Sequence, residues 1–258
     1  EANGLPTSQA HIYQGPSNPC IRANCNTPIN GVYEVPTYNV GSSSSVQDSQ
    51  SWIHANCVHG WVLMQKRSSA SLSFEKTWDE YAEGFSDKDN MWLGNENIHR
   101  LTRGGAVLRV RLRESGGTVA VAEYSNFKVG NAASKYALTI SGYKAVQGNP
   151  GDAMGYHHAR KFSTKDQDND TWGSSCATKY HGAWWYGACH HSNLNGVYHT
   201  PGRVRTDTGV TWATWAGFYN SMKYVDMLIK PTAHPLWSGS PSNQWPSGTS
   251  FPAGAHFC

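Results

Sequence analysis

Hydrophobic and polar residues alternate along several short segments of the chain, and this alternation predicts β-strands. The clearest strand is the segment GWVLMQK at residues 60–66, and the same period of two recurs at residues 105–114, 117–124 and 136–141. A strand-like signal returns near the end of the chain, at residues 210–231. Together these segments predict a sheet as the main element of the fold.

Helical spacing is rarer and is confined to two segments. In residues 74–85, Trp78, Tyr81 and Phe85 fall on one face of a helix, which predicts a short amphipathic helix. Residues 96–102 predict a further helical turn. Beyond Gly142 the periodicity weakens into long loops, which are uncommon in compact domains unless they are functional or held by a metal.

Composition agrees with a loop-rich domain whose core is built from aromatic side chains. The 258 residues include 12% aromatic residues, with 26 Gly and 12 Pro, and only 38% of the chain is hydrophobic. Residues 1–19 are polar and predict an extended arm, whereas residues 232–258 form a tail rich in Pro, Ser and Gly. The tract at residues 41–47 is of low complexity and predicts a surface loop.

Charge excludes some functions. The formal net charge is only +3, and the chain has no run of Lys and Arg, so the electrostatic footprint of a nucleic-acid-binding protein is missing. Arg109, Arg111 and Arg113 alternate in LRVRLRE, and we expect them to form a solvated polar face of a strand. The sequence has no apolar stretch long enough to insert into a membrane.

The cysteines point to an oxidising compartment. Six cysteines, an even number, are compatible with three disulfides and with a secreted, extracellular protein. Because the chain starts at Glu1, we expect it to be a processed mature form. Cys176 and Cys189 flank a short segment, and a disulfide between them would contribute about 3 kcal/mol in the chain-entropy model. The alternative is a pair of free buried thiols.

An acidic loop precedes this pair. Asp166, Asp168 and Asp170 alternate with amide residues, and side chains at alternate positions can converge on one side of a loop. Asp168 and Asp170, with the backbone carbonyls of Trp172 and Ser174, would supply the oxygen ligands that Ca²⁺ prefers. The segment lacks the Gly and Glu positions of an EF-hand. The alternative is a solvated turn rich in Asp and Asn.

Several motifs, in one order, resemble those of a known family. The chain resembles the fibrinogen-related domain, which is shared by fibrinogen C-terminal modules, ficolins, angiopoietins and tachylectin-type lectins. The resemblance extends from about Cys25 to Pro231, and it departs from the family at HGW (59–61), in the arm that carries Cys20 and in the tail. The matching motifs are NGVYEV (30–35), FEKTWDEYAEGF (74–85), MWLGNENIHRLT (91–102), EYSNFKVG (123–130), GDAMGYHHARKFSTKDQDND (151–170), WWYGACHHSNLNGVY (184–198) and VTWATWAGFYNSMKYVDMLIKP (210–231).

The resemblance implies an α+β fold over residues 20–231. It implies a disulfide-stapled N-terminal subdomain, a central antiparallel sheet with flanking helices, and a loop-rich, calcium-binding C-terminal subdomain. It pairs Cys25 with Cys57 and Cys176 with Cys189. Cys20 and Cys258 remain, and we expect them to pair within the chain and so tie the tail to the arm; the alternative is an interchain bond.

The resemblance also implies two adjoining sites. Ca²⁺ would be held by Asp168, Asp170 and the carbonyls of Trp172 and Ser174, and the sequon at Asn169 would stay unmodified inside this loop. A pocket beside the loop would receive an N-acetyl group, next to a cis peptide bond between Ala188 and Cys189. The residues implied for this pocket are Tyr180, Trp185, Cys189, His190, Thr206, Asp207 and Tyr219.

Other aromatic residues and histidines have simpler expected roles. We expect Trp184, Trp212 and Trp215 to belong to the core. His157 and His158 are expected to be loop residues, with a zinc-binding role as the alternative. His191 is equally compatible with either role, pocket or loop.

The function that follows from the resemblance is a secreted lectin of innate immunity. It would bind N-acetylated carbohydrates (N-acetylglucosamine, N-acetylgalactosamine or sialic acid) on microbial or cell surfaces, with calcium as a brace. The alternative is a protein-binding module that recognises a receptor or builds a clot. An enzyme is not expected, because the sequence has no nucleophile elbow, HExxH or phosphate loop. A homo-oligomer would have to form through the arm, the tail or a face of the domain, because the sequence has no collagen repeat or coiled-coil heptads.

Overall fold

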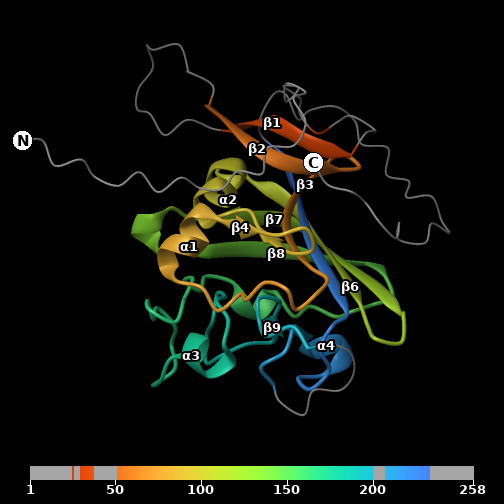
Figure 1. Ribbon diagram of the computed structural model, residues 1–258, viewed down its shortest axis with the longest axis vertical. Helices are drawn as coiled ribbons and strands as arrows, with labels where there is room; N and C mark the ends of the chain where they lie inside the picture. Colours follow the sequence, from red (N-terminus) through yellow and green to blue (C-terminus); the bar gives the residue numbers. More distant parts are fainter. Residues whose placement is uncertain (1–24, 26–29, 38–50, 200–206, 233–258) are drawn as a thin grey trace, which may run out of the picture.

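A central antiparallel sheet organises the molecule (Figure 1). The computed structural model describes residue 25 and residues 30–37, 51–199 and 207–232. In this part of the chain nine strands form one sheet, and every pairing in it is antiparallel. The main path runs β1 (Gly31–Thr37), β2 (Ser51–Val58), β3 (Trp61–Arg67), β11 (Tyr224–Pro231), β6 (Ala106–Arg113), β7 (Val119–Val129) and β8 (Leu138–Gln147). The short strands β4 (Phe85–Ser86) and β5 (Met91–Trp92) pair with each other, and β5 also pairs with β3.

The last strand of the described chain lies in the middle of the sheet. β11 pairs with β3 on one side and with β6 on the other, so residues near the end of the matched region close the core. The central position of β11 explains why the strand is mostly apolar: Val225, Met227, Leu228 and Ile229 are all buried. The strands predicted from alternation are therefore present, and the α+β fold class is confirmed.

The N-terminal hairpin is fastened by a disulfide. Cys25 and Cys57 are bonded, with their Cα atoms 5.3 Å apart, as the resemblance implied. The turn from β2 to β3 consists of His59 and Gly60, whose φ angles of 48° and 82° are both positive. Two-residue hairpin turns favour positive φ at both positions. The HGW segment, a departure from the family pattern, is thus compatible with a tight hairpin.

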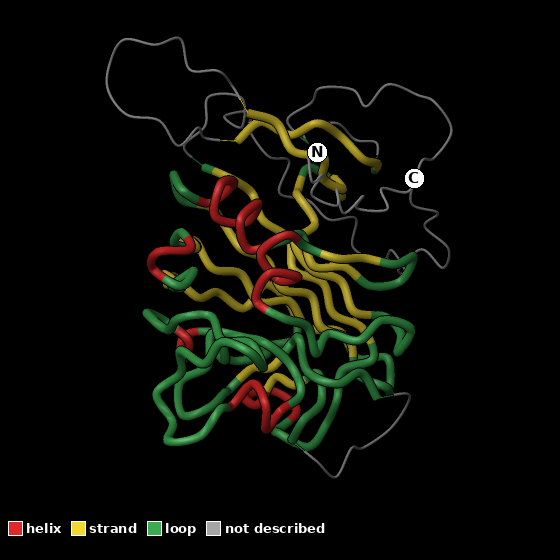
Figure 2. The backbone as a smooth tube through the Cα atoms, turned by 60° about the vertical axis from the view of Figure 1, so that its left-hand side comes forward, coloured by secondary structure: helices red, strands yellow, loops and turns green. Residues whose placement is uncertain are grey.

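Two helices pack on the sheet, as Figure 2 shows. α1 (Trp78–Glu83) begins with a capping box, in which Thr77 and Glu80 exchange side-chain and backbone hydrogen bonds. It ends at Gly84, where φ is 98° and an added Cβ would lie 2.7 Å from the carbonyl oxygen of Leu93. The predicted helix over residues 74–85 was therefore too long. α2 (Asn95–Thr102) agrees with the predicted turn.

The expectation of a solvated arginine face was wrong for Arg111. This side chain is only 7% exposed, and its guanidinium bonds both carboxylate oxygens of Asp226, the residue directly opposite on β11. Arg109 also pairs with the residue opposite, Glu123 on β7, but its Nε and Nη2 donate to a single carboxylate oxygen, at 3.0 and 2.8 Å, and its guanidinium lies 4.3 Å from the ring centroid of Trp61. Alternation identified the face, but the burial of that face depends on neighbouring strands.

Beyond β8 the chain is dominated by loops, which occupy the lower part of Figures 1 and 2. The expected core residues Trp184 and Trp212 are fully buried there, and Trp215 is partly buried. The predicted strand at VTWATW is only two residues long and continues into a short helix. The short elements of this part are the 3₁₀-helix η2 (Gly155–His157), α3 (Cys176–Tyr180), β9 (Ser192–Asn193), β10 (Thr211–Trp212) and α4 (Ala213–Ala216), and a further 3₁₀-helix, η1 (Ala132–Ser134), lies between β7 and β8.

Buried polar side chains of β3 join the sheet to these loops. Arg67 is 1% exposed and donates hydrogen bonds to the carbonyl oxygens of Leu194 and Gly196, at 3.1 and 2.8 Å. Gln65 donates to the carbonyl oxygen of Leu194 at 2.9 Å. Loop backbone that would otherwise be buried without partners is thereby satisfied, which fixes its position on the sheet.

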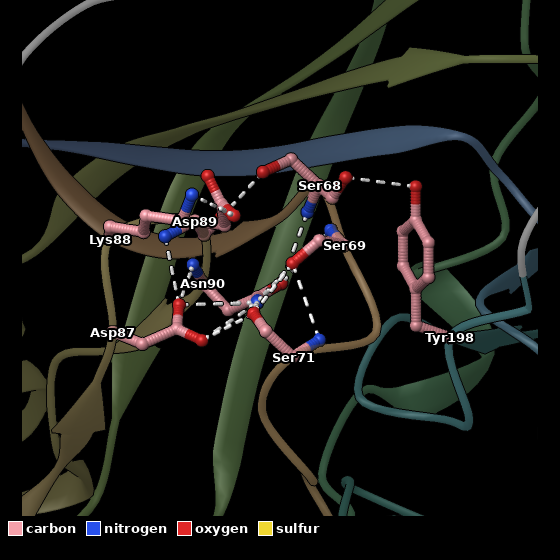
Figure 3. Close-up of polar contacts among 8 residues, drawn as sticks. All are labelled: Ser68, Ser69, Ser71, Asp87, Lys88, Asp89, Asn90 and Tyr198. Carbon is pink, nitrogen blue, oxygen red and sulfur yellow. Dashed lines mark hydrogen bonds and ion pairs between the residues drawn. The ribbon is translucent and has the colours of Figure 1, made fainter.

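A polar cluster beyond β3 makes a second connection (Figure 3). Asn90, which is 1% exposed, donates to the hydroxyl oxygens of Ser69 and Ser71. Asp87 accepts the backbone N–H groups of the two residues before β5, while Tyr198 donates its hydroxyl to the carbonyl oxygen of Ser68 at 3.0 Å. These hydrogen bonds give the cluster a structural role: they hold together the chain after β3, the turn between β4 and β5, and the segment that carries Tyr198.

Candidate ligand pocket and calcium loop

The acidic loop is folded around Asp170. Its two carboxylate oxygens accept the backbone N–H groups of Trp172 and Cys176, each at 2.8 Å, and its own N–H donates to Asp168 at 3.1 Å. Burial raises the pKa of Asp170, and the neighbouring Asp168 carboxylate raises it further. Two adjacent carboxylates, one of them partly buried, favour a cation between or beside them.

Asp166 has a different role from the other two aspartates. Its Oδ1 accepts the N–H of Trp78, at the start of α1, at 2.9 Å, and the hydroxyl of Thr164 at 2.7 Å. A carboxylate at the N-terminus of a helix satisfies a backbone donor that has no partner within the helix. Asp166 therefore fastens the loop to α1, which leaves Asp168 and Asp170 as the acidic pair.

The donor set fits Ca²⁺ if backbone oxygens take part. Within the described ranges, no group of three or more His, Cys, Asp and Glu side chains gathers as metal ligands. The carbonyl oxygens of Trp172 and Ser174 accept no described hydrogen bond and remain available. Two carboxylates, two carbonyls and water make a set of hard oxygen ligands of the kind that Ca²⁺ uses in extracellular modules. Asn169, in the same loop, donates its side-chain amide to the carbonyl oxygen of Phe162 at 2.8 Å.

The second disulfide links the acidic loop to the pocket. Cys176 and Cys189 are bonded, with their Cα atoms 5.5 Å apart, and the alternative of free thiols is excluded. Cys176 begins α3, whose N-cap Ser175 accepts the N–H of Thr178 at 3.2 Å. The helix ends at Tyr180, so one short element carries both the disulfide and a predicted pocket residue.

His157 anchors the chain between Trp185 and Ser192, part of which lines the pocket. It is fully buried, its Nδ1 lies 2.7 Å from the carbonyl oxygen of Trp185, and its Nε2 accepts the N–H groups of His191 and Ser192 at 3.3 and 3.1 Å. A carbonyl can only accept, so Nδ1 carries the proton and Nε2 does not. Burial lowers the pKa of His157 to about 3, which keeps the ring neutral. His157, which we expected to be a loop residue, is thus a buried anchor. The side chain of its exposed neighbour His158 accepts, among the described residues, one N–H, that of Ile140.

A pocket of about 290 Å³ opens above this segment. Five of the predicted residues line it: Tyr180, Cys189, His190, Asp207 and Tyr219. Trp185 does not; it is fully buried and donates its indole N–H to the carbonyl oxygen of Tyr136 at 2.8 Å. Thr206 lies outside the described residues, as do Cys20 and Cys258.

Sequence reasoning missed part of the lining. Tyr156 and Phe218 also line the pocket, as do Ala188, whose peptide bond to Cys189 was expected beside it, and His191, for which both roles were open. The ring of His191 stacks on that of Tyr156, with centroids 4.1 Å apart. The available signal for Phe218 was the pair of adjacent aromatics Phe218 and Tyr219, which follows a short helix that ends at a glycine. No comparable signal marked Tyr156.

His190 is the most unusual group in the pocket. It is 6% exposed, and neither ring nitrogen has a partner of good hydrogen-bond geometry among the described residues, although the ring also interacts with the backbone of Asp207. Burial lowers the pKa of His190 to about 4, against the opposing attraction of Asp207, so the ring is neutral at pH 7. A buried polar group without a partner is costly, which makes a ligand that supplies one favourable.

The pocket floor has the backbone geometry that the resemblance implied. The peptide bond between Ala188 and Cys189 is cis. Ala188 donates its N–H to the phenolic oxygen of Tyr156 at 3.0 Å, and Gly187 donates to the carbonyl oxygen of Cys189 at 2.8 Å.

Burial raises the pKa of Tyr180; Asp207 raises it further, while Lys179 opposes the shift.

Comparison with known proteins identifies the fold. The profile of the family described as fibrinogen beta and gamma chains, C-terminal globular domain, matches residues 25–232. Ryncolin-4 from Cerberus rynchops is 41% identical over 174 residues, which cover 67% of this chain and 50% of that protein. Human angiopoietin-related protein 7 is 39% identical over 208 residues, 80% of this chain and 59% of that protein. The chain thus spans about half to three-fifths of these relatives.

Solved structures agree. The fibrinogen-like globe domain of human ANGPTL2 superposes with a TM-score of 0.72 at 32% identity, covering 79% of this chain and 93% of that one. A lamprey fibrin D-dimer complexed with the peptide Gly-His-Arg-Pro-amide superposes with a TM-score of 0.73 at 27% identity, covering 95% and 85%. Among the described residues, no helix has the length and apolar character needed to span a bilayer.

Proposed function

The chain belongs to the family of fibrinogen C-terminal globular domains, and from that premise we propose that it is a secreted, calcium-braced lectin that binds N-acetylated carbohydrates. The observation that carries this proposal is His190, which is buried at the edge of an aromatic-lined pocket without a partner of good hydrogen-bond geometry among the described residues. The proposed activity is binding rather than catalysis.

An N-acetyl group matches the chemistry of the lining. Its methyl needs an apolar wall, which the rings of Tyr180, Phe218 and Tyr219 supply. Its carbonyl oxygen needs a donor, and a neutral His190 carries one N–H that makes no hydrogen bond of good geometry with a described residue. Its amide N–H needs an acceptor, and the carboxylate of Asp207 lines the same pocket. A small apolar site with a few polar groups of this kind confers selectivity by orientation.

Calcium would act as a brace and not as a direct ligand of the sugar. When bound, it supplies positive charge that offsets the repulsion between Asp168 and Asp170. Because Asp170 also accepts the N–H of Cys176, the loop is joined to α3 and, through the disulfide, to Cys189. Order in the acidic loop is thereby transmitted to the pocket floor. Disulfides and a calcium site of this type both favour an extracellular setting, where acetylated glycans on microbial or cell surfaces are the proposed partners.

A peptide is the second candidate ligand. The related lamprey fibrin is complexed with Gly-His-Arg-Pro-amide, a peptide with a cationic N-terminus and a cationic Arg. Asp207 would suit an ammonium group. However, Lys179 acts electrostatically on both Tyr180 and His190 and offsets Asp207, so the pocket favours a neutral amide over a doubly cationic ligand.

Titration calorimetry with calcium present tests both candidates. The wild-type protein should bind N-acetylglucosamine and not glucose, and His190→Ala should weaken that binding by about tenfold, the value of one lost hydrogen bond in a desolvated site. His158→Ala, a matched exposed histidine, should have no effect. Unchanged binding by His190→Ala would refute the pocket assignment. Binding of Gly-His-Arg-Pro-amide that is lost when its N-terminus is acetylated would support the peptide instead.

A further inference from the structure

Lys179 lies beside the pocket between two aromatic faces. Its ammonium nitrogen is 4.8 Å from the ring centroid of Trp172 and 5.1 Å from that of Tyr180, which lines the pocket. Both distances are within the range of a cation–π interaction. The side chain is exposed, and within the described ranges no carboxylate forms an ion pair with it. Lys179 is therefore a cation that is held in place without a direct ion pair among the described residues, although Asp207 interacts with the same Tyr180 side chain.

Exposed aromatic surface gathers at the same place. The described residues include four large apolar side chains that are well exposed: Val146, Trp172, Phe218 and Tyr219. Phe218 and Tyr219 line the pocket, and Trp172 flanks Lys179. Three of the four thus border one region, which is the distribution expected of a binding surface and not of scattered surface residues. This surface extends beyond the volume that an acetamido group would fill.

Charge is unevenly distributed over this region. His190 is neutral at pH 7, so it contributes no cation inside the pocket. Asp207 contributes one negative charge to the lining, whereas Lys179 contributes one positive charge outside it. A ligand with a neutral amide inside and an acidic group toward Trp172 would match both. The aromatic faces limit the freedom of the Lys179 side chain, so less entropy is lost when it pairs with an anion.

We propose that Lys179, held between Trp172 and Tyr180, is a specificity residue that binds an acidic group carried by the ligand beside its N-acetyl group. Carboxylate and sulfate share the required chemistry, and the protein prefers such acidic N-acetylated sugars to neutral ones. The inference rests on the proposed acetamido pocket. It adds a residue that does not line the pocket and a direction in which the bound ligand extends.

Titrations with three sugars test this inference. They are N-acetylglucosamine, its 6-sulfate and N-acetylneuraminic acid, each measured with calcium at low and at raised salt. The wild-type protein should bind at least one of the two acidic sugars about fivefold more tightly than the neutral one, the upper range for an exposed ion pair, and the preference should shrink with salt. The acid that gains identifies the group.

Variants at Lys179 complete the test. Lys179→Gln should abolish the acidic preference, measured as the ratio of the affinities for the acidic and the neutral sugar, Lys179→Arg should retain that ratio, and Lys161→Gln, another exposed lysine, should match the wild type. An acidic preference that survives in Lys179→Gln, or equal binding of all three sugars by the wild type, would overturn the inference and leave the acetamido pocket intact. Binding of none of the three would overturn the proposed function as well.

Discussion

Replacing His157 by leucine removes the anchor beneath the pocket while keeping a buried apolar side chain in its place. Three backbone groups lose their partner: the carbonyl of Trp185 and the N–H groups of His191 and Ser192. Two of these hydrogen bonds are buried, and the one to His191 is partly buried. The leucine cannot donate or accept, so the groups remain unsatisfied in the folded state.

The magnitude follows from that count. An unsatisfied buried backbone group costs about 1–3 kcal/mol, so the loss for His157→Leu should be roughly 3–5 kcal/mol after allowing for partial relaxation. That is a large fraction of the 5–15 kcal/mol by which domains are usually stable. At about 2–4 °C per kcal/mol for a domain of this size, the melting temperature should fall by roughly 6–20 °C.

Urea unfolding followed by tryptophan fluorescence measures this loss, with His158→Leu as the control. The control residue is adjacent and exposed, and its side chain accepts one partly buried backbone N–H, that of Ile140, so its replacement should cost about 1 kcal/mol. A cost below 1 kcal/mol for His157→Leu, or equal costs for the two variants, would refute the argument that His157 anchors the segment.

Three further predictions concern acid, buried charge and calcium. The folded pKa values of His157 and His190, about 3 and about 4, lie below the usual 6.5, so the unfolded chain takes up the extra protons. Stability should therefore fall as the pH is lowered from 6.5 to 4. In a pH series of urea titrations, His190→Gln should reduce the slope of the unfolding free energy against pH by about 1.4 kcal/mol per pH unit, and an unchanged slope would contradict this. Asp226→Asn leaves a buried arginine without its charge partner and should cost about 3–5 kcal/mol by urea unfolding, whereas Glu123→Gln at the more exposed pair should cost under about 1 kcal/mol; similar costs would contradict the burial argument. At 10 mM, calcium should stabilise the domain by about 1.4–2.7 kcal/mol in a thermal melt, for a dissociation constant of roughly 10⁻⁴–10⁻³ M, and Asp170→Asn should abolish this gain; a gain that persists would place the metal elsewhere.

The sequence predicted the sheet well because alternation reports directly on strands with one buried face. It overestimated the length of α1, because Trp78, Tyr81 and Phe85 share a helical spacing although Gly84 ends the helix between the last two. It also misjudged Arg111, whose burial depends on β11, a strand more than a hundred residues away in sequence. Local patterns specify periodicity but not which distant element covers a face.

The candidate site was predicted to a similar degree. The motif around the second disulfide located Tyr180, Cys189 and His190 together, and the structure brings them to one pocket. Tyr156 was missed because the sequence drew attention to the following pair, His157 and His158, and not to the tyrosine before them. The three aspartates of the acidic loop look equivalent in sequence; only the capping hydrogen bond to Trp78 distinguishes Asp166 from the other two.

Saturation-transfer NMR on the calcium-loaded protein with N-acetylglucosamine tests the central claim most directly. If the acetamido group enters the pocket against the rings of Tyr180 and Tyr219, the acetyl methyl protons should receive the strongest saturation of any proton in the sugar, and glucose should receive none. Saturation spread evenly over the sugar ring, or transfer to glucose at a similar level, would contradict the account.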